Sequence, residues 1–178
     1  MSKRNLLLML SLVLFMGSTV IAQNKYVGAD KCKMCHNSPA KGEQYKLWQG
    51  SKHSQAMKSL SSPEALDYAK KNGIADPATD PKCTKCHSTA AGADKALVEA
   101  TLTVAEGVSC ESCHGPGSVY KGMAIMKVQA DAVKNGLIIP DEKTCTVCHT
   151  KEGNPFYKEF NYSEFSKKIA HPNPTKAK

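Results

Sequence analysis

Hydrophobic residues are concentrated at the start of the chain and are short and scattered in the rest. An apolar run over 6–16, interrupted only by Ser11, follows a short basic stretch and leads to a small-residue site that ends at Ala22. This layout is typical of a secretory signal peptide, and the run is about half as long as a membrane-spanning helix requires. We therefore expect a signal peptide over 1–22 and an exported, periplasmic single domain over 23–178, with no stable membrane insertion after cleavage.

Beyond the leader, helix start and stop signals divide the chain into short helices. A serine followed by a proline places a cap before the first helical position, which predicts helices that begin after Ser38 and after Ser62. The first should extend to about residue 58 and be loosened at Gly50, and the second should end before Gly73. We also expect helix caps at Asp30 and Asp141, a helix from Ser118 to about Asn135, and strand character over 98–104. The chain should end with a helix and a disordered basic tail over 172–178. The apolar face of that terminal helix should be formed by Phe156, Phe160, Phe165 and Ile169.

All eight cysteines occur in four pairs of the same spacing, and a histidine directly follows each pair. The pattern C-x-x-C-H is the attachment signature of c-type haem. On one helical turn the two thiols and the imidazole share a face, so the thiols can bond the two haem vinyl groups while the imidazole reaches the iron. We therefore predict four covalently bound haem c groups, attached through Cys32 and Cys35, Cys83 and Cys86, Cys110 and Cys113, and Cys145 and Cys148, with His36, His87, His114 and His149 as iron ligands.

Three other uses of paired cysteines fit the pattern less well. Structural zinc can be held by C-x-x-C pairs, but zinc does not require a histidine after every second cysteine. Disulfides are usual in exported proteins, yet four such tight pairs would cross-link little of the chain. A redox dithiol has no reason to be repeated four times in a chain without a thioredoxin-like pattern. Covalent haem is the interpretation that explains every cysteine and the histidine beside it.

Four porphyrins in a chain of 178 residues also determine the expected fold. A domain of this size cannot enclose four haems and also build a separate aliphatic core, so the porphyrins should supply much of the interior. We expect a mainly α, small and loop-rich domain. The formal net charge is +8, but the basic residues are scattered and the chain is exported, which argues against nucleic acid as a partner.

The remaining histidines limit how the four irons can be completed. Only His53 and His171 lie outside the C-x-x-C-H motifs, so imidazole can supply a sixth ligand to at most two irons, and we expect both histidines to ligate. Methionine packs more often than it ligates, so at least one of the other irons should be open or bound to water. The candidate ligands for those irons are Met57, Met123, Met126 and Tyr120.

The order of motifs along the chain resembles the tetrahaem cytochrome c-554 family. Trp48 and His53 stand in a W-x-x-x-x-H-x-x-A-M segment, and the third haem motif lies in G-V-x-C-E-x-C-H-G-P-G over 107–117. The best-known member of the family accepts electrons from hydroxylamine oxidoreductase in ammonia-oxidising bacteria. The resemblance implies that His53 ligates the third haem, that His171 ligates the fourth, and that the iron on His87 is five-coordinate.

The chain departs from the family after the Gly-Pro-Gly turn. The family draws a histidine for the first haem from this region, whereas the segment 118–126 contains none. The iron on His36 is therefore either ligated by Met123 or Met126, or open.

These features predict an exported electron-transfer protein that works between a redox-protein donor and a redox-protein acceptor. The alternative is a small-molecule haem reductase, acting on nitric oxide, peroxide or hydroxylamine at an open five-coordinate haem, although no general acid or base can be assigned. A haem filament, in which neighbouring protomers supply missing ligands, has no positive support in the sequence. Basic residues that could guide docking of a redox partner are Lys167, Lys168, Lys176 and Lys178.

Overall fold

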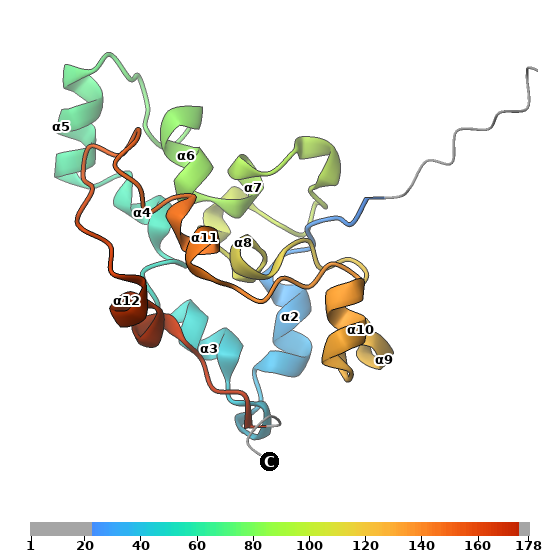
Figure 1. Ribbon diagram of the computed structural model, residues 1–178. Helices are drawn as coiled ribbons and strands as arrows, with labels where there is room; N and C mark the ends of the chain where they lie inside the picture. The colour runs from blue at the N-terminus through green and yellow to red at the C-terminus, as the bar shows by residue number, and fades with distance from the viewer. Residues whose placement is uncertain (1–22, 175–178) are drawn as a thin grey trace, which may run out of the picture.

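The computed structural model describes residues 23–174, which form short helices joined by loops (Figure 1). The expected signal peptide over 1–22 and the end of the expected tail, 175–178, lie outside the described residues. Within the described part there is no β-strand, only an isolated parallel bridge between Tyr26 and Val98. The prediction of a mainly α, loop-rich fold is confirmed. The helices in chain order are α2 (Ala29–His36), η1 (Pro39–Lys41), α3 (Gln44–Gln49), α4 (Ala56–Ser59), α5 (Pro63–Lys71), α6 (Pro81–His87), α7 (Thr89–Gly92), η2 (Lys95–Leu97), η3 (Val104–Glu106), α8 (Cys110–His114), α9 (Met123–Met126), α10 (Gln129–Lys134), α11 (Glu142–Thr146) and α12 (Tyr162–Ile169).

Side-chain caps begin two of the helices where the sequence predicts them. The Ser62 hydroxyl accepts a hydrogen bond from the backbone N–H of Ala65, and Pro63 is the first residue of α5. At the start of α11, Asp141 and Thr144 form a capping box, in which each side chain satisfies a backbone N–H of the other. Such caps satisfy N–H groups that have no partner inside the helix, so these two starts are set by local sequence.

The helix predicted over 39–58 is wrong in its extent. The chain instead forms η1, α3 and α4 with two interruptions. Gly42 and Glu43 have φ values of 96° and 51°, which a right-handed helix does not contain, and Gly50 ends α3. His53 consequently lies in the turn between α3 and α4 rather than inside a long helix.

Three further expectations are corrected by the structure. The single helix expected from Ser118 onward is split into α9 and α10, and the Ser118 hydroxyl accepts a hydrogen bond from the N–H of Lys25 instead of capping a helix. The segment 98–104 forms no strand. Asp30 is not a cap but lies inside α2, where its carboxylate accepts a hydrogen bond from the Tyr45 hydroxyl. In each of these three segments, a residue from a different part of the sequence contacts the side chain or the backbone.

The aliphatic core of the described part is thin. Large hydrophobic side chains such as Leu47, Ile139 and Val147 are half or more exposed. Because few aliphatic side chains are buried, apolar surface remains that another apolar group can cover. The predicted porphyrins would cover it. None of the helices within 23–174 is long and apolar enough to cross a membrane. The buried hydrophobic residues are Val27, Ala29, Tyr45, Leu60, Ala69, Leu102, Tyr120 and Ala132.

Candidate functional site

Each C-x-x-C-H motif occupies about one turn of helix. The first lies in α2, the second in α6 and the third in α8. The fourth begins in α11 and continues helically, because the N–H of His149 donates to the carbonyl of Cys145 at 3.0 Å. All eight cysteines lie within the described residues, and none forms a disulfide bond there. The structure therefore places two thiols and one imidazole on a common turn four times, as attachment of haem c requires.

Three of the motif histidines have their Nδ1 atoms engaged by oxygen atoms. The Nδ1 of His87 is 2.9 Å from the carbonyl of Ala56, and that of His114 is 3.1 Å from the carbonyl of Ile138. A carbonyl can only accept, so Nδ1 carries the proton and Nε2 keeps its lone pair. His36 is held in the same manner, 3.3 Å from the Oε1 of Gln44. These contacts are typical of metal-ligating histidines, whose second nitrogen is usually hydrogen-bonded.

The two histidines outside the motifs each face a motif histidine. The ring centroids of His53 and His149 are 6.1 Å apart, and those of His114 and His171 are 5.9 Å apart. Metal–imidazole bonds are roughly 2 Å long, so two imidazoles on opposite sides of one metal ion have centroids about 6 Å apart. Both pairs therefore have the spacing that a shared iron requires. The pairing differs from that implied by the resemblance, since His53 faces the fourth motif and His171 the third.

Burial lowers the pKa of all four paired histidines. The proximity of His149 lowers the pKa of His53 further, and the proximity of His114 does the same for His171. A charged imidazole is disfavoured in both pairs, because it is desolvated and faces another ring that can be charged. The neutral imidazole is the form that binds metal, so the environment of each pair suits ligation.

Thiols from different motifs lie side by side. Cys32 in the first motif and Cys110 in the third are close enough to interact, and this interaction together with burial raises the pKa of Cys110. In the second and fourth motifs, burial and the neighbouring Cys86 thiol raise the pKa of Cys148 to about 12. The fold thus brings the first motif to the third and the second to the fourth.

A cavity of about 1110 Å³ lies where the second and fourth motifs meet. This volume is slightly above the usual range for ligand pockets, roughly 300–1,000 Å³. Three of the six histidines, His53, His87 and His149, line it. The same cavity is lined by the lysines Lys52, Lys82, Lys85, Lys151 and Lys158 and by the glutamates Glu64, Glu152 and Glu159. The lysines outnumber the glutamates and suit the carboxylates that a haem carries.

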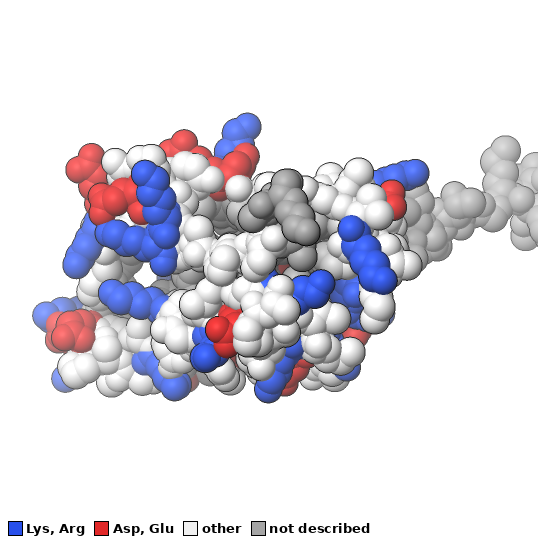
Figure 2. Space-filling view, turned by 90° about the horizontal axis from the view of Figure 1, so that it is seen from below, with Lys and Arg blue, Asp and Glu red and all other residues white. Residues whose placement is uncertain are grey.

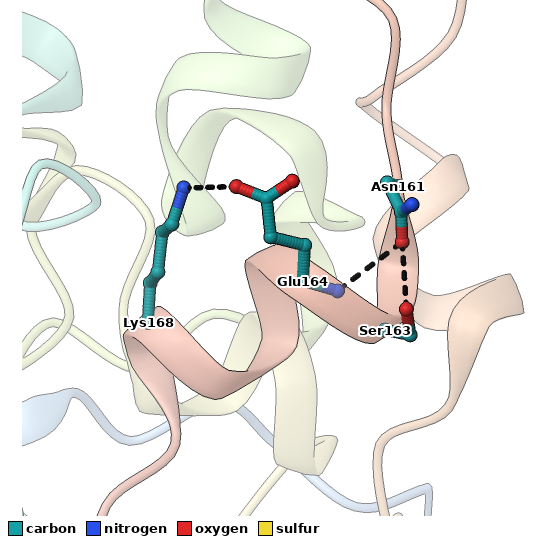
Figure 3. A network of polar contacts seen from close by, with 4 residues as sticks. All are labelled: Asn161, Ser163, Glu164 and Lys168. Atoms are coloured by element: carbon teal, nitrogen blue, oxygen red, sulfur yellow. Dashed lines mark hydrogen bonds and ion pairs between the residues drawn. The ribbon is translucent and has the colours of Figure 1, made fainter.

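Helix α12 is fixed at its start by a local polar network, shown in Figure 3. The Oδ1 of Asn161 accepts hydrogen bonds from the N–H of Glu164 at 3.2 Å and from the Ser163 hydroxyl at 2.8 Å. Lys168 pairs with the Glu164 carboxylate at 2.6 Å one turn later. The predicted terminal helix is confirmed only from residue 162 onward: Phe165 and Ile169 lie in α12, whereas Phe156 and Phe160 precede it, so the expected four-residue apolar helix face is wrong. The N-terminus of α12 is defined by the asparagine cap.

The segments on either side of α12 reach the two histidine pairs. Before the helix, the Phe160 ring stacks on His149 with centroids 4.6 Å apart and an interplanar angle of 15°. Phe165 stacks in turn on Phe160. The segment after the helix carries His171. This one short helix and the segments that flank it therefore place two stacked phenylalanines at the fourth motif and the His171 imidazole at the third.

Gly42 and Gln44 hold the segment that carries His171. The Nε2 of Gln44 donates to the carbonyl of Pro172 at 2.7 Å, while its Oε1 contacts His36. A Cβ atom on Gly42 would lie 2.5 Å from the same carbonyl, closer than atoms can approach without a shift. The chain after α12 therefore rests directly on the backbone at Gly42.

His36 and His87 have no facing imidazole, since the two pairs use the other four histidines, all of which lie within 23–174. Among the candidate sixth ligands, Tyr120 is buried and its hydroxyl donates to the carbonyl of Gly115 at 2.7 Å. Burial also raises the pKa of Tyr120, so the phenol is a poor ligand. Met123 is 67% exposed, which leaves Met126 as the better-placed methionine of α9.

On the face seen in Figure 2, basic side chains are interspersed with acidic ones, so this face does not single out a docking patch. Of the four lysines predicted to guide docking, Lys168 is paired with Glu164, and Lys176 and Lys178 lie outside the described residues. A lysine-guided docking site stays a prediction.

Several residues that support the histidines could not be found from the sequence. Gln44 supports His36 through its side chain, and Ile138 supports His114 through its carbonyl. Phe160 was predicted as part of an apolar helix face, but no sequence signal indicates that it stacks on His149. Contacts of this kind join distant positions, and only the folded chain brings them together.

Comparison with known proteins places the chain near one family. Residues 31–115 match the family described as cytochrome c554 and c-prime. Cytochrome c-554 from Nitrosomonas europaea is 31% identical over 157 residues, which cover 79% of this chain. The chain spans 64% of the length of that relative. No solved structure matches. The predicted resemblance to the cytochrome c-554 family is confirmed.

Proposed function

We propose, taking the confirmed similarity to cytochrome c-554 as the premise, that the protein is an exported tetrahaem c-type cytochrome that carries electrons between two redox proteins. This proposal rests on two pairs of facing imidazoles, His53 with His149 and His114 with His171. A site closed by two imidazoles keeps its ligands in both oxidation states and excludes substrate, which suits electron transfer rather than catalysis.

Four haem groups would be held by the eight motif cysteines, with His36, His87, His114 and His149 as the first axial ligand of each. When bound, haem c supplies reversible one-electron chemistry. The chain orients the imidazoles through the acceptors on their Nδ1 atoms, which also raise the basicity of the ligating nitrogens. His53 would be the second axial ligand of the haem at the fourth motif, and His171 would be the second axial ligand of the haem at the third motif.

The contacts between motifs would join the four sites in one line. Cys32 lies beside Cys110, which links the first motif to the third, and Cys86 lies beside Cys148, which links the second to the fourth. Cys113 of the third motif is close enough to Cys145 of the fourth for their charges to interact. Electrons would therefore pass in the order first, third, fourth and second motif, or the reverse.

The proposed location is the periplasm. The signal peptide over 1–22 would direct export, and haem attachment would occur on the domain over 23–178. The partners would be one electron-donating and one electron-accepting redox protein, met at exposed edges of the outer sites.

A reductive titration of the purified native protein tests the proposal. Four reversible one-electron steps per chain are expected, together with four haems per chain by the pyridine haemochrome method. Fewer than four electrons, or zinc in place of iron, would overturn it.

A second function is favoured by one observation at the second motif. His87 has no facing imidazole among the described residues, and it lines the large cavity. An open iron there could reduce a small molecule such as nitric oxide, peroxide or hydroxylamine, with electrons from the other three sites. Anaerobic turnover with each of these molecules separates the two functions. Binding without turnover supports the carrier, and sustained turnover supports the reductase.

A further inference from the structure

Glu111, inside the third haem motif, is deeply buried, with 1% of its surface exposed. Both carboxylate oxygens are engaged by backbone. The N–H of Val27 lies 2.9 Å from Oε1 and 3.0 Å from Oε2, and the N–H of Gly28 donates to Oε2 at 2.8 Å. The N–H of Gly117 donates to Oε1 at 2.7 Å. The carboxylate therefore ties the chain before α2 to the turn after α8.

No cation accompanies this carboxylate in the described part of the chain. The ion pairs there are all on the surface and involve other acidic residues. A Cβ atom on Gly117 would lie 3.0 Å from Oε1, so the backbone itself occupies the space beside the carboxylate. Charges buried without an ion-paired partner are rare, and the hydrogen bonds that this carboxylate accepts within the described residues all come from backbone N–H groups.

The location of Glu111 connects two haem-attachment motifs. It directly follows Cys110, and Val27 and Gly28 lead directly into the helix that carries Cys32. Helices α2 and α8, which carry Cys32 and Cys110, also pack against each other. A charge at this point acts on the first and third sites, whereas the second and fourth motifs gather around the separate large cavity.

We propose that Glu111 is a positioning residue that locks the first and third haem motifs together and, through its buried negative charge, lowers the reduction potentials of the haems at those two motifs. This rests on the proposed function, since it concerns the haems assigned there. A negative charge favours the oxidised iron, which is the more positive form. The effect is large because a buried charge is poorly screened.

The test compares E111Q with S118A in the haem-loaded full protein. E111Q removes the charge and keeps the shape. S118A removes the hydrogen bond from the N–H of Lys25 to the Ser118 hydroxyl, which joins the same two segments, without changing the charge. Potentials are measured by redox titration with optical and electron paramagnetic resonance detection, after the native protein has shown four haems and four electrons. A failure of the proposed function would appear at that first step, before any variant is compared.

The expected result is that E111Q retains four haems and that two of its four potentials rise. At a fixed solution potential, the ratio of reduced to oxidised haem at those two sites should increase on the order of tenfold. In S118A all four potentials should stay at their native values. Unchanged potentials in a fully loaded E111Q, or equal shifts in both variants, would overturn the proposal.

If E111Q does not load four haems, E111D carries the test. It keeps the charge but shortens the side chain, so the expected result is a lower melting temperature with native potentials. Raised potentials at the first and third sites of E111D would show that packing, not charge, sets them.

Discussion

The imidazole of His171 faces the imidazole of His114 at 5.9 Å between ring centroids, although one lies near the chain end and the other in the third haem motif. This relationship depends on contacts outside the pair. α12 sets the direction of the final segment, and Gly42 and Gln44 hold the backbone at Pro172. A terminal residue can therefore serve as a ligand because the segment around it is fixed at several points.

Replacing either histidine outside the C-x-x-C-H motifs should open one iron. His53→Ala should convert one low-spin haem to high spin, and His171→Ala should convert a different one, because each removes one imidazole from a different pair. All four haems should stay attached, since attachment depends on the cysteines. Electron paramagnetic resonance of the oxidised variants measures the change, and an unaltered spectrum would mean that the histidine does not ligate.

Phe160→Leu identifies which haem each histidine serves. The Phe160 ring stacks on His149, so this variant should shift the low-spin signal that His53→Ala removes and leave the other low-spin signal unchanged. A shift instead in the signal removed by His171→Ala would contradict the pairing of His53 with His149.

Gly42→Ala should displace His171 although residue 171 itself is unchanged. The added Cβ would lie 2.5 Å from the Pro172 carbonyl, so the segment after α12 must move away. Gly73→Ala is the matched control, because Gly73 also has positive φ but has open space around its Cβ position. Both variants should lose about 1–2 kcal/mol of stability from left-handed backbone, but only Gly42→Ala should show a new high-spin haem by absorbance. A similar spectrum in both variants would rule out the proposed docking of the terminal segment.

The open sites can be counted by gas binding. Reduced native protein should take up at least one and at most two equivalents of carbon monoxide, because His36 and His87 lack a facing imidazole within 23–174. If Met126 completes the iron on His36, Met126→Ala should raise the uptake by one equivalent. Met123→Ala should leave it unchanged, since Met123 is 67% exposed. Zero uptake by the native protein would mean that all four irons are capped and would remove the basis for the reductase alternative.

Acid should destabilise the protein through the paired histidines. Histidine in an unfolded chain has a pKa of about 6.5, and burial lowers the pKa of folded His53 and His171 below it. As the pH falls through this window the unfolded chain binds more protons than the folded one, so the free energy of unfolding decreases. Each histidine can contribute up to about 1.4 kcal/mol per pH unit, and ligation to iron acts in the same direction.

Thermal unfolding across this pH range measures the effect. The double variant His53→Gln, His171→Gln should lose part of the acid sensitivity while Glu and Asp titrations at lower pH are retained. The same pH dependence in native and variant proteins would assign the effect to other groups.

The local chemistry of the site could be predicted because it is encoded in consecutive residues. A C-x-x-C-H motif carries its geometry within one helical turn, and the caps at Ser62 and Asp141 act over three residues. The existence of these helices therefore follows from short stretches of sequence.

The rest could not be predicted because it depends on contacts between distant segments. The sequence predicts a helix that continues through Gly42 and Glu43, but both residues have positive φ, which ends the helix there. The partner of His53 is fixed by where α11 packs, and the burial of Glu111 by the chain before α2. The aliphatic core is also thin. The spacing of hydrophobic residues along the chain therefore does not predict how the segments pack.

Intact-protein mass spectrometry of the exported, native protein, with alkylation of free thiols, tests the central claim most directly. The account predicts a mass equal to the chain from residue 23 onward plus four haems, with none of the eight cysteines alkylated. A mass with fewer haems, or alkylation at any C-x-x-C pair, would contradict the assignment of a tetrahaem cytochrome.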